Sequence, residues 1–108
     1  MAIEGGELIG WADFVPDERE SLKHTAQLGM GVLKAFRGKG IGEQLLTHIT
    51  NAAIDFGFVR LELEVFSNNQ AGVSLYKKQG FVLEGTKEKA RYIDNEYQDV
   101  LIMSKLFV

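Results

Sequence analysis

The sequence predicts an α/β domain with a mixed sheet, and two patterns in its 108 residues support this. In two segments, apolar residues recur at three- and four-residue intervals, the period of an amphipathic helix. Around these segments, short stretches alternate apolar and polar residues and end at glycine, proline or asparagine, as strands do. The resulting order is β-α-β-α-β-β. Strands that alternate with helices favour parallel pairing, and the closing hairpin adds antiparallel strands.

Each element has its own signal. A hairpin leading into a strand is expected before the only proline, Pro16, and a polar loop after it. The first helix begins after a glycine-rich turn and ends near Gly57, which suits a helix C-cap. The second helix begins at Ser67, Asn68 or Asn69, all N-cap candidates. The expected strands span 3–15, 24–33, 58–66, 81–92 and 97–107, and the expected helices span 41–56 and 69–79.

The composition excludes several kinds of protein and of catalytic site. The length suits one domain, and 45% hydrophobic and 25% charged residues are typical of a soluble globular protein. A net charge of −3 gives no general attraction to nucleic acid. The absence of cysteine excludes disulfides, thiolate metal sites and a cysteine acyl-enzyme. No membrane span or signal peptide is visible, so a cytoplasmic location is the default expectation.

The glycine-rich turn at 33–43 is the most informative segment. Its glycines let backbone N–H groups approach an anion, and the following helix start adds free N–H groups and partial positive charge. Arg37 and Lys39 add full charges there. Neither the P-loop pattern nor the dinucleotide fingerprint fits this segment. A turn that merely closes a strand–helix corner remains an alternative.

Two motifs resemble those of one superfamily. Arg37-x-x-Gly40-x-Gly42 resembles the pyrophosphate-binding motif of the GNAT superfamily of acyl-CoA-dependent N-acetyltransferases. The stretch from Asn69 to Phe81 resembles the Asn-x-x-Ala-x-x-Leu-Tyr-x-x-x-Gly-Phe signature of the same superfamily, with Gly72 in place of alanine. The resemblance covers nearly the whole chain, as a single GNAT-like domain over 1–108. It implies splayed central strands, helices on both faces of the sheet, and a shortened N-terminus that lacks a first strand and two helices.

The resemblance also implies the cofactor contacts. The co-substrate would be acetyl-CoA, with no metal. Its pantetheine arm would pair with the edge of the strand that ends near residue 33, and a backbone N–H there would face the thioester oxygen. Asn69 would hydrogen-bond the cofactor. The implied cofactor-binding residues are Val32, Leu33, Arg37, Gly38, Lys39, Gly40, Ile41, Gly42, Asn69 and Tyr76.

Tyr76 is the main catalytic candidate. A phenol has a pKa near 10, close enough to a thiol's to protonate a departing thiolate, and the resemblance implies this role. A ring that only packs is the alternative. The general base is less clear, because no carboxylate occurs between Thr25 and Leu33. His24 and Glu64 are weak base candidates that also suit exposed positions.

The expected function is transfer of an acetyl group from acetyl-CoA to a primary amine of a small molecule, such as an amino acid, by direct attack in a ternary complex. The missing carboxylate mildly favours an α-amino acceptor, which is partly neutral near pH 8. Two alternatives remain: a protein N-terminal acetyltransferase of the ribosomal-protein type, and a CoA-binding module without turnover. Trp11 suits either the core or a substrate wall. We expect no nucleic-acid or membrane partner, and a homodimer is left open.

Overall fold

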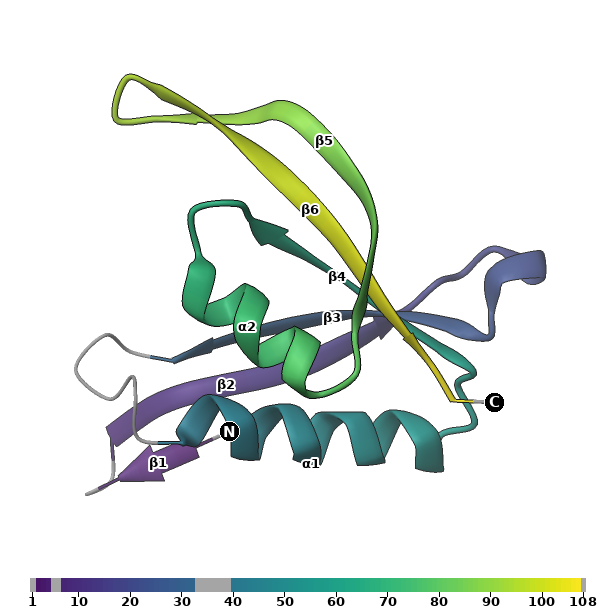
Figure 1. Ribbon diagram of the computed structural model, residues 1–108. Helices are drawn as coiled ribbons and strands as arrows, with labels where there is room; N and C mark the ends of the chain where they lie inside the picture. The colour runs from purple at the N-terminus through teal and green to yellow at the C-terminus, as the bar shows by residue number, and fades with distance from the viewer. Residues whose placement is uncertain (1, 5–6, 33–39, 108) are drawn as a thin grey trace.

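The computed structural model describes residues 2–4, 7–32 and 40–107. These residues form strands and helices in the order expected from the sequence, with a short 3-10 turn, η1 (Glu20–Leu22), inside the expected loop (Figure 1). The strands are β1 (Ala2–Glu4), β2 (Glu7–Pro16), β3 (Thr25–Val32), β4 (Arg60–Phe66), β5 (Val82–Ile93) and β6 (Glu96–Leu106), and the helices are α1 (Ile41–Asp55) and α2 (Gln70–Lys78). Within these residues, neither helix is long and apolar enough to cross a membrane.

The strands form one mixed sheet, as expected. Their order is β1-β2-β3-β4-β6-β5. β3 and β4 pair in parallel, whereas the other neighbouring strands pair antiparallel. The β5–β6 hairpin turns at Asp94 and Asn95, whose φ angles of 52° and 62° are left-handed. Short polar side chains tolerate that conformation better than most residues, which explains why the chain turns there.

The core lies between the sheet and the two helices. β4 alternates, so that Leu61, Leu63 and Val65 are buried while the residues between them face the other side of the sheet. Leu46 of α1 belongs to the same buried cluster as these β4 residues, and Tyr76 of α2 packs against that cluster. The buried cluster is Ala26, Leu28, Leu46, Ile49, Ala53, Leu61, Leu63, Val65, Phe81 and Met103.

The expectation of helices on both faces is therefore wrong for the described residues. α1 and α2 cover the same face of the sheet (Figure 1). The connections explain this, because β3-α1-β4 and β4-α2-β5 step along the sheet in the same direction. Two right-handed crossovers in the same direction place both helices on one side. The opposite face of the sheet is left without a helix from the described residues, and we call it the uncovered face.

Candidate active site

The parallel strands β3 and β4 diverge, as the resemblance implied. They pair only where Thr25–Gln27 meets Arg60–Glu62. Beyond that point β3 continues to Val32 along β2, while β4 continues to Phe66 along β6. Figure 1 shows the two strands separating toward their C-terminal ends. The edge of β3 that faces β4 thus has backbone groups that could pair with an extended ligand, in the manner of an added strand.

The N-terminus of α1 lies at the end of this gap, and it has the geometry of an anion-binding site. Gly40 is the N-cap, with a left-handed φ of 79°, and its carbonyl accepts from the N–H of Gln44 at 3.1 Å. The preceding N–H groups of Ile41, Gly42 and Glu43 therefore have no partner within the helix. They carry the positive end of the helix dipole. The sequence-predicted residues Leu33, Arg37, Gly38 and Lys39 lie outside the described residues.

A lysine from α2 reaches the same helix start. Lys78 Nζ lies 3.3 Å from Glu43 Oε2. Glu43 is an acidic residue in the first turn, so Lys78 compensates a negative charge that would otherwise repel an anion there. Both side chains are well exposed, so the pair itself adds little stability.

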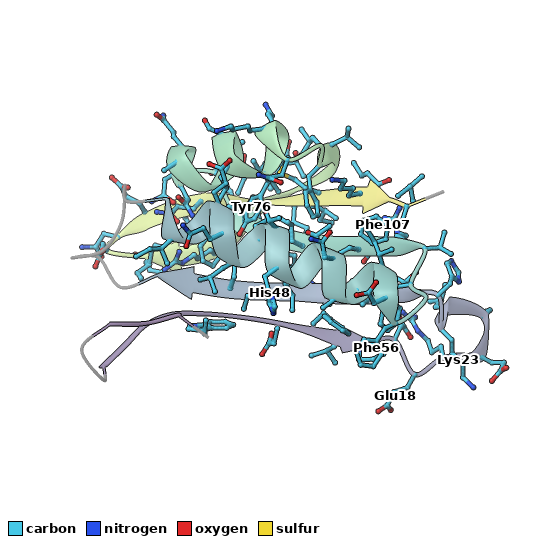
Figure 2. The ribbon with its side chains drawn as sticks, turned by 90° about the horizontal axis from the view of Figure 1, so that it is seen from below. Glu18, Lys23, His48, Phe56, Tyr76 and Phe107 are labelled. Carbon is cyan, nitrogen blue, oxygen red and sulfur yellow. The ribbon has the colours of Figure 1, made fainter. Side chains whose placement is uncertain are left out.

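A shallow depression adjoins Gly40 on the outer side of α1. Its volume is about 570 Å³, and it is open to solvent rather than enclosed. It is lined by Gly40, Glu43, Gln44, Thr47, His48 and Asn51. The side chain of His48 lies along this helix (Figure 2). In the described part of the chain, no three His, Cys, Asp or Glu residues are grouped as a metal site would require.

Asn69 is the N-cap of α2. Its Oδ1 accepts from the N–H of Gly72 at 3.0 Å. The amide nitrogen of Asn69 is a donor that this contact does not use, so the same side chain can cap the helix and face a ligand. The glycine at 72 fits this arrangement, because a Cβ there would lie 2.6 Å from Asn69 Nδ2.

Tyr76 projects from α2 toward the core, and Figure 2 shows it between the two helices. Its ring meets Phe81 edge-on, with ring centroids 5.8 Å apart. Burial raises the pKa of the Tyr76 phenol above 10.0. This shift favours the protonated phenol, which is the form that could donate a proton.

The two candidate bases, His24 just before β3 and Glu64 in β4, lie at different positions along these strands. The carbonyl of His24 accepts from the N–H groups of Val59 and Arg60, at the end where β3 and β4 are paired. This end is one length of α1, roughly 20 Å, from Gly40, and Figure 2 shows the neighbouring Lys23 far from Tyr76. Glu64 instead lies beyond the last β3–β4 pair, on the uncovered face, with Lys87 Nζ 3.0 Å from its Oε1.

Two side chains of β2, those of Trp11 and Asp13, also lie next to the part of β3 that borders the gap. The sequence pointed to Trp11 but not to Asp13. Trp11 pairs with Gly31 and Asp13 pairs with Gly29 in the β2–β3 ladder. Both side chains lie on the uncovered face, because Ala12 between them packs against the core. Asp13 alternates with Ala12 along β2, and this alternation could have indicated which face Asp13 occupies. Only the pairing of β2 with β3 shows that Asp13 lies next to β3.

Comparison with known proteins agrees with this fold. Residues 1–81 match the family model of the acetyltransferase (GNAT) family. The chain is 28% identical to the L-amino acid N-acetyltransferase AaaT of Escherichia coli over 107 residues, which are 98% of this chain and 66% of AaaT.

Two solved structures are also similar. A GNAT acetyltransferase from Streptococcus pneumoniae superposes with a TM-score of 0.91 and 34% identity, over 97% of this chain and 64% of that one. YncA from Salmonella typhimurium, a putative acetyltransferase solved with acetyl-CoA, has the same fold with a TM-score of 0.89 and 23% identity, over 95% and 60% of the two chains. The chain thus spans less than two thirds of these proteins. With this fold and this match over residues 1–81, the chain belongs to the acetyltransferase (GNAT) family.

Proposed function

We propose that this chain is an acetyl-CoA-dependent N-acetyltransferase, a single catalytic domain over 1–108, that acts on the primary amine of a small molecule such as an amino acid. The observation that carries the proposal is the gap between β3 and β4, which has the helix start at Gly40 at one end and Tyr76 on the helix side. AaaT, named for amino-acid acetylation, supports the choice of acceptor.

The cofactor would bind along the gap. The N–H groups of Ile41 and Gly42 would hold the pyrophosphate, together with residues 37–39 and Lys78 nearby. The pantetheine arm would pair with the edge of β3 up to Val32. Asn69 would donate its side-chain amide hydrogen to the cofactor. The roles of Ile41, Gly42 and β3 use backbone groups that the helix start and the diverging strands leave without partners.

The reaction would use one proton acceptor and one proton donor. The amine substrate enters as an ammonium and must lose a proton, which Glu64 would take directly or through water, exchanging its contact with Lys87 for the proton. The neutral nitrogen then attacks the thioester carbonyl carbon, a C–N bond forms, and the carbonyl oxygen becomes negative and is stabilised by a backbone N–H of β3. As the C–S bond breaks and the carbonyl re-forms, Tyr76 would give its proton to the departing thiolate. The nitrogen would then release its second proton, which returns to the Tyr76 phenolate through water, so that the products are the amide and the free CoA thiol.

An amine panel tests this function. Release of free CoA thiol is measured with acetyl-CoA and three acceptors: a free amino acid, the same residue as the N-terminus of a short peptide, and a polyamine. We expect the amino acid to have the highest kcat/KM. A preference for the peptide would favour a protein N-terminal acetyltransferase. Binding of acetyl-CoA without thiol release from any amine would identify a binding module and refute the enzymatic proposal.

A further inference from the structure

The uncovered face beside the gap is formed by side chains of β2 that lie across β3. A Cβ at Gly31 would lie 2.9 Å from Trp11 Nε1, and one at Gly29 would lie 3.0 Å from Asp13 Oδ1 and 3.3 Å from Trp11 Cζ3. The indole therefore extends along β3 over both glycines, and the carboxylate lies beside it. The strand that borders the gap supplies no side chain here, and β2 supplies an aromatic ring and a carboxylate in its place.

Asp13 differs in its charge environment from the other carboxylates of this face. Arg60 binds both Glu62 and Glu84, and Lys87 binds Glu64. Among the ion pairs of the described residues, none includes Asp13. Next to it, Trp11 remains 43% exposed. An exposed carboxylate beside the open face of an indole is a site for an ammonium attached to an apolar group.

The direction of approach places the acceptor on this face. On the other side of the sheet, α1, α2 and Tyr76 fill the space over β3 and β4. An amine that attacks a thioester held in the gap must therefore arrive from the uncovered face. Gly29 lies on β3 just beyond its last residue paired with β4, so the carboxylate above it is beside the point where the gap opens.

We propose, on the basis of the function above, that Asp13 and Trp11 bind the acceptor. Asp13 forms an ion pair with the incoming ammonium where the gap opens, before the amine loses its proton and advances along β3 to the thioester. The indole of Trp11 packs against the carbon skeleton next to the ammonium. The substrate class is a primary amine on an apolar or aromatic skeleton, such as an apolar α-amino acid. A polyamine fits less well, because its second cation would need a carboxylate and the neighbouring ones already bind Arg60 and Lys87.

Kinetics of Asp13→Asn test the ion pair. Loss of a hydrogen bond to a charged group should raise the acceptor KM about tenfold to a hundredfold, while the acetyl-CoA Kd and the kcat at saturating acceptor stay near wild type. The matched control is Asp55→Asn, which removes an exposed carboxylate from the far end of α1. An unchanged acceptor KM in Asp13→Asn overturns the proposal even if the enzyme is active.

Binding can also be followed without turnover. Trp11 is the only tryptophan, so its fluorescence reports this site alone. Phenethylamine and L-phenylalanine should change the emission of the wild type, with weaker binding in Asp13→Asn. Gly31→Ala should displace the indole and weaken binding of both ligands while the protein stays folded, because the conflict is with a side chain. Tighter binding of spermidine than of phenethylamine, or no emission change with any of these ligands, would refute the site independently of whether acetyl transfer occurs.

Discussion

Replacing Gly40 with valine should remove acetyl-CoA binding while leaving a folded protein. The φ of Gly40 is 79°, and a Cβ built there meets no described atom within 4 Å. The substitution therefore adds no clash within the described structure, but it adds a branched side chain at the point where the pyrophosphate would approach. Its intrinsic cost is the left-handed conformation, roughly 1–2 kcal/mol for a non-glycine residue.

Gly57 offers a matched control. Its φ is 90°, and a Cβ there also meets nothing within 4 Å, but it follows the other end of α1. Gly57→Val should therefore lose a similar 1–2 kcal/mol, which is several degrees in Tm for a domain of about this size. It should still bind acetyl-CoA. Gly40→Asn adds a side chain that tolerates φ > 0, and it separates backbone strain from obstruction of the ligand.

The assay is thermal unfolding with increasing acetyl-CoA. A ligand at 100 times its Kd stabilises the native state by about 2.7 kcal/mol, so the wild type and Gly57→Val should show a clear rise in Tm. Gly40→Val and Gly40→Asn should show none. A normal rise in Gly40→Val would mean that the glycine turn only closes a corner between a strand and a helix. Equal loss in Gly57→Val would mean that strain, and not obstruction, abolishes binding.

Three further predictions concern single side chains. Asn69→Asp should keep the apoprotein Tm, because aspartate caps helices as well as asparagine does, but should raise the acetyl-CoA Kd through loss of the amide donor; equal Kd values would leave Asn69 as a helix cap only. Tyr76→Phe should lower kcat about 10²–10⁴-fold with an unchanged acetyl-CoA Kd, and full kcat would reduce Tyr76 to a packing role. A hydrogen bond from Arg60 lowers the pKa of Glu84 below 4.5, so this carboxylate stabilises the fold above that pH and the contribution is lost as the pH falls through the lowered value. In a plot of unfolding free energy against pH, Glu84→Gln should lose less stability at acid pH than the control Glu88→Gln does. Parallel curves for the two variants would refute the role of the Arg60–Glu84 pair.

The order and type of elements could be predicted because local patterns determine them. The alternation in β4 and the three- and four-residue spacing in α1 both reflect burial against one core. The single face covered by both helices was not predicted, because it depends on the position of β5 beyond β6. The sequence did not identify Asp13 because the position of this residue depends on how β2 pairs with β3. Its relation to Gly29 is a cross-strand pair, which no local pattern encodes.

The sheet also separates the groups assigned to the two substrates, and this has a kinetic consequence. Tyr76 acts from the helix side on the departing thiolate, whereas Asp13 acts from the uncovered face on the incoming ammonium. Groups that share no contact usually have additive effects on free energy. The double variant Tyr76→Phe/Asp13→Asn should therefore lower kcat/KM by the product of the two single effects. A double variant no worse than the poorer single one would mean that both residues act on one step through a shared element, and the assignment to opposite faces would have to be abandoned.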